Sequence, residues 1–447
     1  MTSAKELNIS NAWICQVSKK EIVPVFGDII ISSGLISDIH KKNFDELFLN
    51  PSPVSDDTID AGGRVVTIPM INFHDHFYSR LAKGFPVKGS MENFKKILQN
   101  LWWKLDLALD EEMIRASAQM AVLESIRNGV TYIFDHHSSP NSAKGSLNTI
   151  ANVFKESGLR GVLCFEFTDR NGKQLAETGM NENVNFVKNS TNPDLKALLG
   201  LHASFTLEDE SLKNASKLIK EFDIGIHIHL CEDKVDREDS IAKYTSDPVE
   251  RLIKSNLLND KSILAHGIHL TEKEYGLIED KRSALAFNLD SNLNNAVGIP
   301  QFSKIPLKIP VLAGTDGMNS NPARTLKQIF LLSRYSGMSF DESFSFIKKV
   351  YFDQINFIGK YFPDFTSLSV KDRADLIIWD YIPPTPFKQE NFLGHFIYGI
   401  LDRPLHSVIQ NGKILMNNFR ITFNDTKYQK NIVEQGNRLY KKMSELN

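Results

Sequence analysis

The sequence predicts an α/β protein: a (β/α)8 TIM barrel with a small β-sandwich domain formed from both termini. Two observations predict this fold. Eight short apolar runs alternate with helical patterns, and polar residues follow the runs at their C-terminal ends. Barrels of this kind need about 250 residues and build their active sites at the C-terminal ends of their strands, and the chain has 447 residues. An open, doubly wound sheet is the alternative.

Each apolar run is too short for a helix and is rich in Val, Ile and Leu, as in strands that are buried on both faces. The runs are Val65–Ile71, Val130–Phe134, Gly161–Phe167, Ala197–Leu201, Ile224–Ile228, Ser262–Ala265, Ala284–Phe287 and Ile309–Gly314. A closed barrel is favoured over an open sheet, because polar residues from so many strands can then converge.

Helices are expected between these runs. Asp110 is a plausible N-cap, and Gly129 is placed to end the helix that follows it. Similar patterns occur at Leu147–Ser157, Thr206–Phe222 and Asp247–Leu257.

The two ends of the chain have β-rich patterns, so residues 1–64 and 366–447 are expected to form one composite β-sandwich domain. Residues 65–365 would then form the barrel. Hairpins are predicted around residues 33–34 and at Asn411-Gly412, a strong two-residue turn signal. A strand is expected at Ala374–Asp380, and a terminal helix at Asp425–Leu446.

Composition bounds the function. With 52 Lys and Arg against 54 Asp and Glu, the net charge of −2 offers no electrostatic argument for a nucleic-acid or membrane partner. Three scattered cysteines and an N-terminus without a basic and apolar signal favour the cytoplasm. The expected partners are a small-molecule substrate and a second copy of the chain in a homodimer.

Histidines at the ends of the runs predict a metal site. His74 and His76 are two residues apart on a strand, so their side chains point to the same side. His229, His266 and Asp316 follow three other runs. Imidazoles with a carboxylate suit one divalent ion, Zn²⁺ or Fe²⁺.

These motifs resemble the amidohydrolase superfamily, in the branch of the cytosine deaminases and chlorohydrolases, and most closely the SsnA-type aminohydrolases. The likeness covers the barrel and both flanks. It is carried by FHDHFYSRLAKG at 73–84, LWWKLDLALDEE at 101–112, DHHSSP at 135–140, CFEFTDRNG at 164–172, GLHASFT at 200–206, HIHLCED at 227–233, LAHGIHL at 264–270, FNLDSNLNNAVG at 287–298 and AGTDG at 313–317.

The resemblance implies roles for residues. The metal ligands would be His74, His76, His229 and Asp316. The catalytic residues would be Glu232, His266 and Asp316, with Asp316 accepting the proton of the metal-activated water and Glu232 protonating a ring nitrogen. The substrate would meet His202, Ser291 and Asn292. His136, which ends the second run, is expected either to contact the substrate or to support the metal ligands.

The predicted function is a metal-dependent aminohydrolase, a hydrolytic deaminase of an amino-substituted N-heterocycle or cyclic amidine. The alternatives are hydrolysis of another C–N or C–Cl bond, or a non-catalytic metal-containing binding protein.

Further expectations concern single residues near the site. His227 is expected to point away towards the helices. Trp102 and Trp103 are expected in the core, with a lid over an aromatic ring as the alternative. Asp290 would favour a basic substrate or pair with Arg80.

Overall fold

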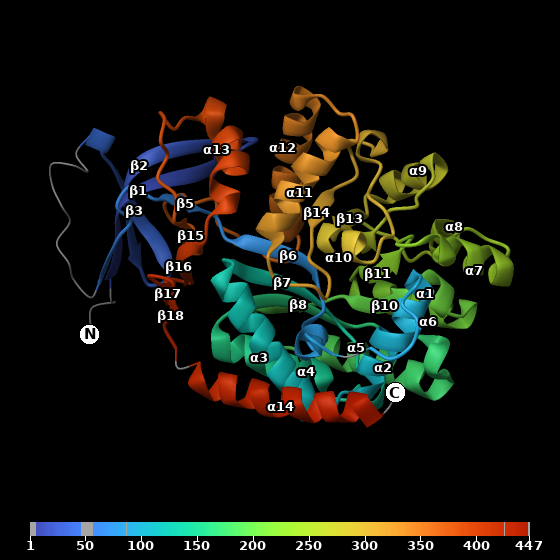
Figure 1. The fold of residues 1–447 in the computed structure, drawn as a ribbon. Coiled ribbons are helices and arrows are strands. Elements are labelled where there is room, and N and C mark those ends of the chain that lie inside the picture. The colour runs from blue at the N-terminus through green and yellow to red at the C-terminus, as the bar shows by residue number, and fades with distance from the viewer. Residues whose placement is uncertain (1–5, 46–56, 86, 424, 446–447) are drawn as a thin grey trace. The chain divides into compact units, whose positions relative to one another are not determined.

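The computed structural model describes residues 6–45, 57–85, 87–423 and 425–445 (Figure 1). The chain divides into two compact units. The sheet unit comprises Met1–Ile71, Ser125–Thr131 and Phe344–Asn424, and the barrel unit comprises Asn72–Glu124, Tyr132–Ser343 and Asp425–Asn447.

The sheet unit contains one hydrogen-bonded sheet that joins strands from both ends of the chain, in the order β18-β17-β16-β15-β5-β1-β2-β3, with β4 beside β1. Its strands are β1 (Glu6–Ser18), β2 (Glu21–Ser32), β3 (Leu35–Lys41), β4 (Thr58–Asp60), β5 (Val65–Thr67), β15 (Leu376–Trp379), β16 (Leu405–Gln410), β17 (Lys413–Asn417) and β18 (Arg420–Ile421). The centre of the sheet is β5, which pairs with β1 in parallel and with β15 antiparallel. A composite domain built from both termini is therefore confirmed.

Both predicted hairpins are present. Ser33 and Gly34 connect β2 and β3 with φ of 53° and 81°, and Asn411 and Gly412 connect β16 and β17 with φ of 52° and 70°. Two-residue hairpin turns of type I′ need positive φ at both central positions, which favours Asn and Gly there.

The barrel unit is built on parallel strands in two sheets, β6-β7-β8-β9 and β10-β11-β12-β13-β14. The strands are β6 (Met70–Asp75), β7 (Val130–His137), β8 (Arg160–Phe165), β9 (Leu195–Ala197), β10 (Leu199–Ala203), β11 (Ile226–Leu230), β12 (Ile263–His266), β13 (Ala284–Phe287) and β14 (Val311–Ala313). Isolated parallel bridges join Asp75 to Asp316 and Phe167 to Leu201, linking the edges of the two sheets. Only Leu198 separates β9 from β10, so these two occupy a single predicted strand position.

Helices follow the strands, as the alternating pattern predicts. In the barrel unit they include α1 (Phe94–Ile97), α2 (Trp103–Ala108), α3 (Glu111–Arg127), α4 (Ser146–Ser157), α5 (Lys173–Asn189), α6 (Asp209–Phe222), α7 (Lys234–Tyr244), α8 (Pro248–Lys254), α9 (Glu272–Lys281), α10 (Leu289–Asn294) and α11 (Pro322–Tyr335). Asp110 caps α3 as predicted, since its Oδ1 accepts the Met113 amide at 3.0 Å.

Apart from the short segment Ser125–Thr131, which belongs to the sheet unit although it was expected in the barrel, the predicted domain boundaries differ from the structure in three places. The run Val65–Ile71 is shared, because β5 pairs within the sheet unit whereas β6 belongs to the barrel strands. Helix α12 (Phe340–Ile358), which was expected in the barrel, lies mostly in the sheet unit. That unit also contains α13 (Phe392–Tyr398).

The third difference concerns the terminal helix, α14 (Thr426–Glu445), which belongs to the barrel unit and runs along α3 and α4 in Figure 1. The reason lies in its polar contacts. Arg438 binds Asp110 and Glu112 at 2.8 and 2.6 Å, and the Tyr428 hydroxyl donates to Glu156 at 2.9 Å.

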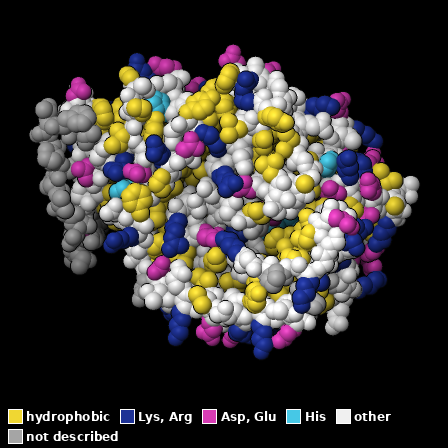
Figure 2. Space-filling view, in the orientation of Figure 1, with side chains coloured by type: hydrophobic (Ala, Val, Ile, Leu, Met, Phe, Trp, Pro, Cys, Tyr) yellow, Lys and Arg dark blue, Asp and Glu magenta, His cyan; other side chains and the backbone are white. Residues whose placement is uncertain are grey.

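Two surface properties agree with the composition. Figure 2 shows basic and acidic side chains intermingled over the visible face, as a net charge of −2 leads one to expect. Within the described residues, no helix combines the length and the apolar character that crossing a bilayer would require.

Candidate functional site

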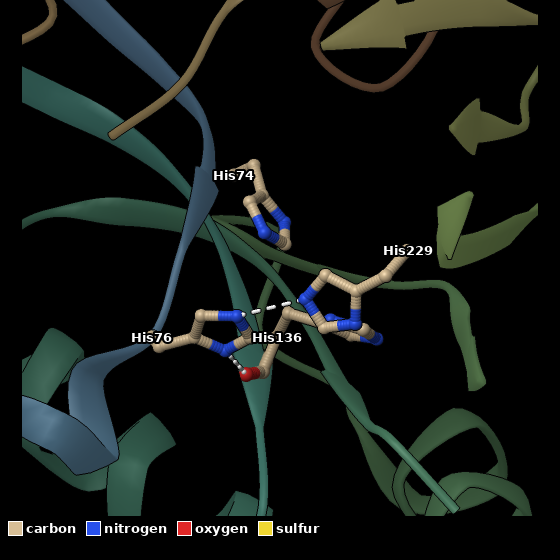
Figure 3. Close-up of side chains that lie close together, drawn as sticks. All are labelled: His74, His76, His136 and His229. Atoms are coloured by element: carbon tan, nitrogen blue, oxygen red, sulfur yellow. Dashed lines mark hydrogen bonds between the residues drawn. The ribbon is translucent and has the colours of Figure 1, made fainter. Parts of the chain in front are cut away.

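The structure brings the four predicted metal ligands together at the C-terminal ends of β6, β11 and β14. His76 Nε2 lies 3.0 Å from His229 Nε2 and 3.0 Å from Asp316 Oδ1. His74 Nε2 lies 3.7 Å from the same Asp316 oxygen. Figure 3 shows the imidazoles of His74, His76 and His229 converging on one point.

The Nδ1 atoms of these imidazoles are held from behind, which orients the rings. His76 donates from Nδ1 to the His136 carbonyl at 2.5 Å, and His229 donates to the His202 carbonyl at 2.7 Å (Figure 3 draws the first). His74 Nδ1 lies 2.9 Å from His227 Nε2. With Nδ1 occupied, each ring turns the lone pair of Nε2 towards the shared centre.

This arrangement calls for a cation. The lone pairs of two imidazoles and a carboxylate oxygen approach one another to about 3 Å, and the buried Nε2 of His74 has no hydrogen-bond partner in the described part of the chain. Burial is the largest influence on His76 and opposes a charge there, but the hydrogen bond to Asp316 and the charges of Asp316 and Glu166 together outweigh it and raise the pKa of His76 to about 9. Three imidazole nitrogens and a carboxylate fit one Zn²⁺ or Fe²⁺.

Asp316 faces this centre in a constrained conformation. Its φ of 54° lies in the left-handed region, which non-glycine residues adopt mainly where the surroundings enforce it. Ser291 donates its hydroxyl proton to Oδ2, and the Gly317 amide donates to Oδ1 at 2.8 Å. Burial favours the neutral acid, but His76 and its neighbouring imidazoles hold the pKa of Asp316 well below its usual range.

His266 and Glu232 lie beside the ligands. His266 donates from Nδ1 to Asn292 Oδ1 at 2.7 Å, so its Nε2 lone pair faces Glu232 Oε2 at 3.4 Å and Asp316 Oδ2 at 3.9 Å. Burial, with the nearby charge of Asp316, raises the pKa of Glu232 well above its usual range. Burial of Glu232 therefore favours the neutral form of its carboxyl group, the form that a general acid uses.

A cavity with an aromatic and apolar wall opens beside this cluster. Trp102 and Trp103 line it, although a core position was expected for them. They lie at the junction of α2 with a π-helical turn at Leu98–Trp102 and pack against Phe94 and Leu98. The two side chains thus pack against an apolar cluster and also line the cavity, and their contact with an aromatic ring of a substrate stays a prediction.

The four predicted substrate contacts separate into two pairs. His202 and Ser291 line the cavity. Asn292 instead holds the ring of His266. His136 is completely buried and stacks on His227 with 4.5 Å between ring centroids, which fits the alternative that it supports the metal ligands.

The expectation for His227 is wrong. Residues two apart on a strand share a face, so His227 points into the barrel with His229 and contacts His74.

The expected pairing of Asp290 with Arg80 is also wrong. Asp290 Oδ1 lies 3.0 Å from Arg324 Nε, whereas Arg80 is buried in an ion pair with Asp75. The reason is that Arg80 follows β6 directly and lies within reach of the acid at the end of that strand.

The sequence reading missed two buried acids in the cavity wall. Glu166 follows β8, and Asp106 lies in α2; both are at most 2% exposed. Burial raises the pKa of Glu166 to about 7 and that of Asp106 to about 6. A signal existed for Glu166, because it is the one charged residue in the apolar run Gly161–Phe167.

Known proteins resemble this chain over nearly its full length. A 5'-deoxyadenosine deaminase of Methanococcus aeolicus is 27% identical over 431 residues, which cover 92% of this chain and 95% of the relative. The fold is similar to that of a zinc-bound adenosine deaminase from Xanthomonas campestris, with a TM-score of 0.75, 18% identity and coverage of 97% and 98%. It is equally similar to the zinc complex of atrazine chlorohydrolase TrzN from Arthrobacter aurescens, with a TM-score of 0.75, 19% identity and coverage of 97% and 100%.

The predicted resemblance to the amidohydrolase superfamily and the predicted fold class are confirmed, whereas the likeness to the SsnA-type aminohydrolases stays a prediction. The model of the amidohydrolase family matches residues 65–415, which is most of the chain. The chain belongs to the amidohydrolase family.

Proposed function

We propose that this protein is a metal-dependent hydrolytic deaminase of an amino-substituted N-heterocycle or cyclic amidine. The observation that carries the proposal is the place of the Glu232 carboxyl group, which is buried in the wall of an aromatic-lined cavity beside a cluster of metal-ligating side chains. The deaminase names of its relatives support the same reaction type.

One divalent ion, Zn²⁺ or Fe²⁺, would be held by His74, His76, His229 and Asp316. When bound, such an ion would lower the pKa of a coordinated water to about 7 and so supply a nucleophile at neutral pH. Ser291 orients Asp316 through its hydrogen bond to Oδ2.

The remaining steps belong to side chains of the chain. Asp316 takes a proton from the attacking water, and Glu232 gives its proton to the ring nitrogen beside the carbon that is attacked. His266, with its Nε2 lone pair towards both acids, holds the water for attack. Asp316 returns its proton to the amino group, so that the C–N bond breaks and ammonia leaves. The proton of the added hydroxyl group passes to Glu232 as the carbonyl forms, which restores the acid for the next turnover.

The experiment is ammonia release by zinc-loaded protein across amino-purines, amino-pyrimidines and cyclic amidines, with metal analysis of the same sample. Glu232→Gln should retain the metal and lose at least about a hundredfold in kcat, the range that general acids contribute. Asp233→Asn is the matched control, because it neutralises the adjacent acid and keeps the cap on Val235. Unchanged turnover in Glu232→Gln would refute the acid role, and chloride release alone would indicate a dehalogenase.

The cytoplasmic location and the homodimer stay predictions. Light scattering during size-exclusion chromatography tests the second, since one species near the monomer mass of 50.6 kDa would exclude a stable dimer.

A further inference from the structure

One wall of the cavity carries hydrogen-bond acceptors that the proposed reaction leaves unused. Glu166, Asp106 and His202 all line the cavity and are all buried. They come from the ends of β8 and β10 and from α2, whereas Glu232, Ser291 and Asp316 come from the segments after β11, β13 and β14. The acceptors therefore come from other strands and helices than the groups that are proposed to react.

Glu166 presents an open carboxylate oxygen. Its Oε2 accepts no hydrogen bond within the described ranges, although the side chain is 2% exposed. The neighbouring nitrogens are His136 Nδ1 at 3.5 Å and His229 Nδ1 at 3.8 Å. His229 already donates its Nδ1 proton to the His202 carbonyl. A buried acceptor without a donor is costly, so a donor from a bound molecule would stabilise this site.

Asp106 has one occupied and one open oxygen. Its Oδ2 takes Ser138 Oγ at 3.2 Å and an ion pair with Arg170, while Oδ1 has no hydrogen-bond partner in the described part of the molecule. Arg170 also lies over the ring of Trp103 at 5.2 Å. The Arg170 guanidinium therefore pairs directly with Asp106 and acts on Glu166 as a nearby positive charge.

His202 adds a third acceptor, as its hydrogen bonds define the tautomer. The Thr206 hydroxyl donates its single proton to the Ala203 carbonyl at 3.0 Å, so it must accept from His202 Nδ1, 2.9 Å away. The Nε2 atom of His202 is then left with a lone pair.

A second metal ion fits this wall poorly. Glu166, His202 and His229 have ligand atoms within 4.8 Å of one another. However, His229 donates a hydrogen bond from Nδ1 to the His202 carbonyl, and its Nε2 faces the first metal centre, so neither nitrogen is available to a second ion. Two ligands remain, fewer than the three protein ligands of a catalytic zinc site.

We propose that Glu166, aided by His202 and Asp106, reads a substrate edge that carries N–H donors, and that Glu166 is thereby a specificity-determining residue. The substrate class is an amino-substituted heterocycle with a second amino group or ring N–H away from the carbon that is hydrolysed. This inference rests on the proposed function for the identity of the reacting group.

The test compares probes that differ by a single amino group: 2,6-diaminopurine against adenine, and 2,4-diaminopyrimidine against 4-aminopyrimidine. Equilibrium binding is measured by calorimetry with zinc-loaded proteins that also carry Glu232→Gln, which suppresses turnover, and ammonia release is measured separately without that substitution. The proteins are wild type, Glu166→Gln and the control Glu182→Gln, whose carboxylate binds the backbone of Gly145 and Leu147.

Wild type and the control should bind the diamino member of at least one pair about tenfold to a hundredfold more tightly, the range for a hydrogen bond to a charged group. Glu166→Gln should bring that ratio close to one, because its amide replaces an acceptor with a donor. Equal binding within both pairs by wild type, or a ratio unchanged in Glu166→Gln, would overturn the inference.

Two further outcomes separate the hypotheses. Selective binding without any ammonia release would refute the proposed function and keep the recognition role of Glu166. If Glu166→Gln instead loses a preference for adenosine over adenine, or if wild type holds two zinc ions and this variant one, the acceptor wall reads ribose hydroxyls or a metal, and the inference is wrong.

Discussion

The histidines of the site differ in what supports them. His76 and His229 donate hydrogen bonds from Nδ1 to backbone carbonyls, which no substitution removes. The Nδ1 atom of His74 is instead hydrogen-bonded to a side chain, the imidazole of His227. The sequence pattern predicted His74, His76 and His229 because chemistry and spacing mark them, but it placed His227 on the wrong face. Glu166 was not predicted as a site residue, because a single acid within an apolar run interrupts the strand pattern without indicating a site. In the structure it lines a cavity.

Replacing His227 should therefore weaken metal binding without touching a ligand. We expect His227→Leu to lower zinc affinity by about 10- to 100-fold, the range for lost support of a ligating histidine. His227→Gln should recover part of the loss, because its carbonyl oxygen can accept the His74 Nδ1 proton. Chelator competition measures the affinity.

The control for this series is His137→Leu, which removes a neighbouring buried imidazole that bonds Ser139. Equal zinc affinity in His227→Leu and wild type would show that His74 needs no support from His227.

At the scale of elements, the strand ends were predictable and the connections were not. Buried parallel strands read as near-continuous apolar runs, so seven of the eight runs coincide with strands of the barrel unit, β9 and β10 together forming one. The run Val65–Ile71 covers β5 and the first two residues of β6. The two strands are divided by their pairing partners, which lie in different sheets. The position of Trp102 and Trp103 depends on how residues 94–108 fold over the cavity, which periodicity does not specify.

Trp103 should contribute to substrate binding and not to the metal. We expect Trp103→Ala to raise KM for the best substrate about tenfold, since stacking of a base on an aromatic ring contributes about 1–3 kcal/mol. Zinc content should stay at the wild-type value. Trp103→Phe keeps an aromatic face and should lose less; equal KM values in all three proteins would exclude contact between this ring and the substrate.

Arg80 links the end of β6 to the loop after β14. Its guanidinium pairs with Asp75 and donates to the carbonyls of Gly317 and Asn319 at 3.1 and 3.0 Å. Arg80→Met should cost about 3–5 kcal/mol of unfolding free energy, because it leaves a buried carboxylate without its cation. Denaturant titration measures the loss.

The double variant Arg80→Met, Asp75→Asn is the control for this explanation, since it removes both charges. It should recover stability relative to Arg80→Met. A double variant that is less stable than the single one would place the role of Arg80 in its carbonyl contacts instead.

At the scale of the whole molecule, the candidate ligands all lie in one of two compact units. The segment that carries β6 crosses from the sheet unit into the barrel unit at Asn72, just before His74. His76 follows β6 directly, His229 lies in β11, and Asp316 follows β14. Metal binding should therefore raise the free energy of unfolding of the barrel unit.

Removal of the metal should consequently destabilise the barrel unit and leave the stability of the sheet unit unchanged. At a free zinc concentration of 1,000 Kd, binding stabilises the folded state by about 4.1 kcal/mol. Hydrogen exchange of zinc-loaded and chelator-treated protein should thus differ in β11, β12 and β14, where opening of the barrel unit exposes the amides. The β2–β3 and β16–β17 hairpins supply the internal control and should exchange at equal rates in both samples. Equal acceleration in both units would mean that they open together, and unchanged exchange throughout would contradict a metal site formed by His74, His76, His229 and Asp316.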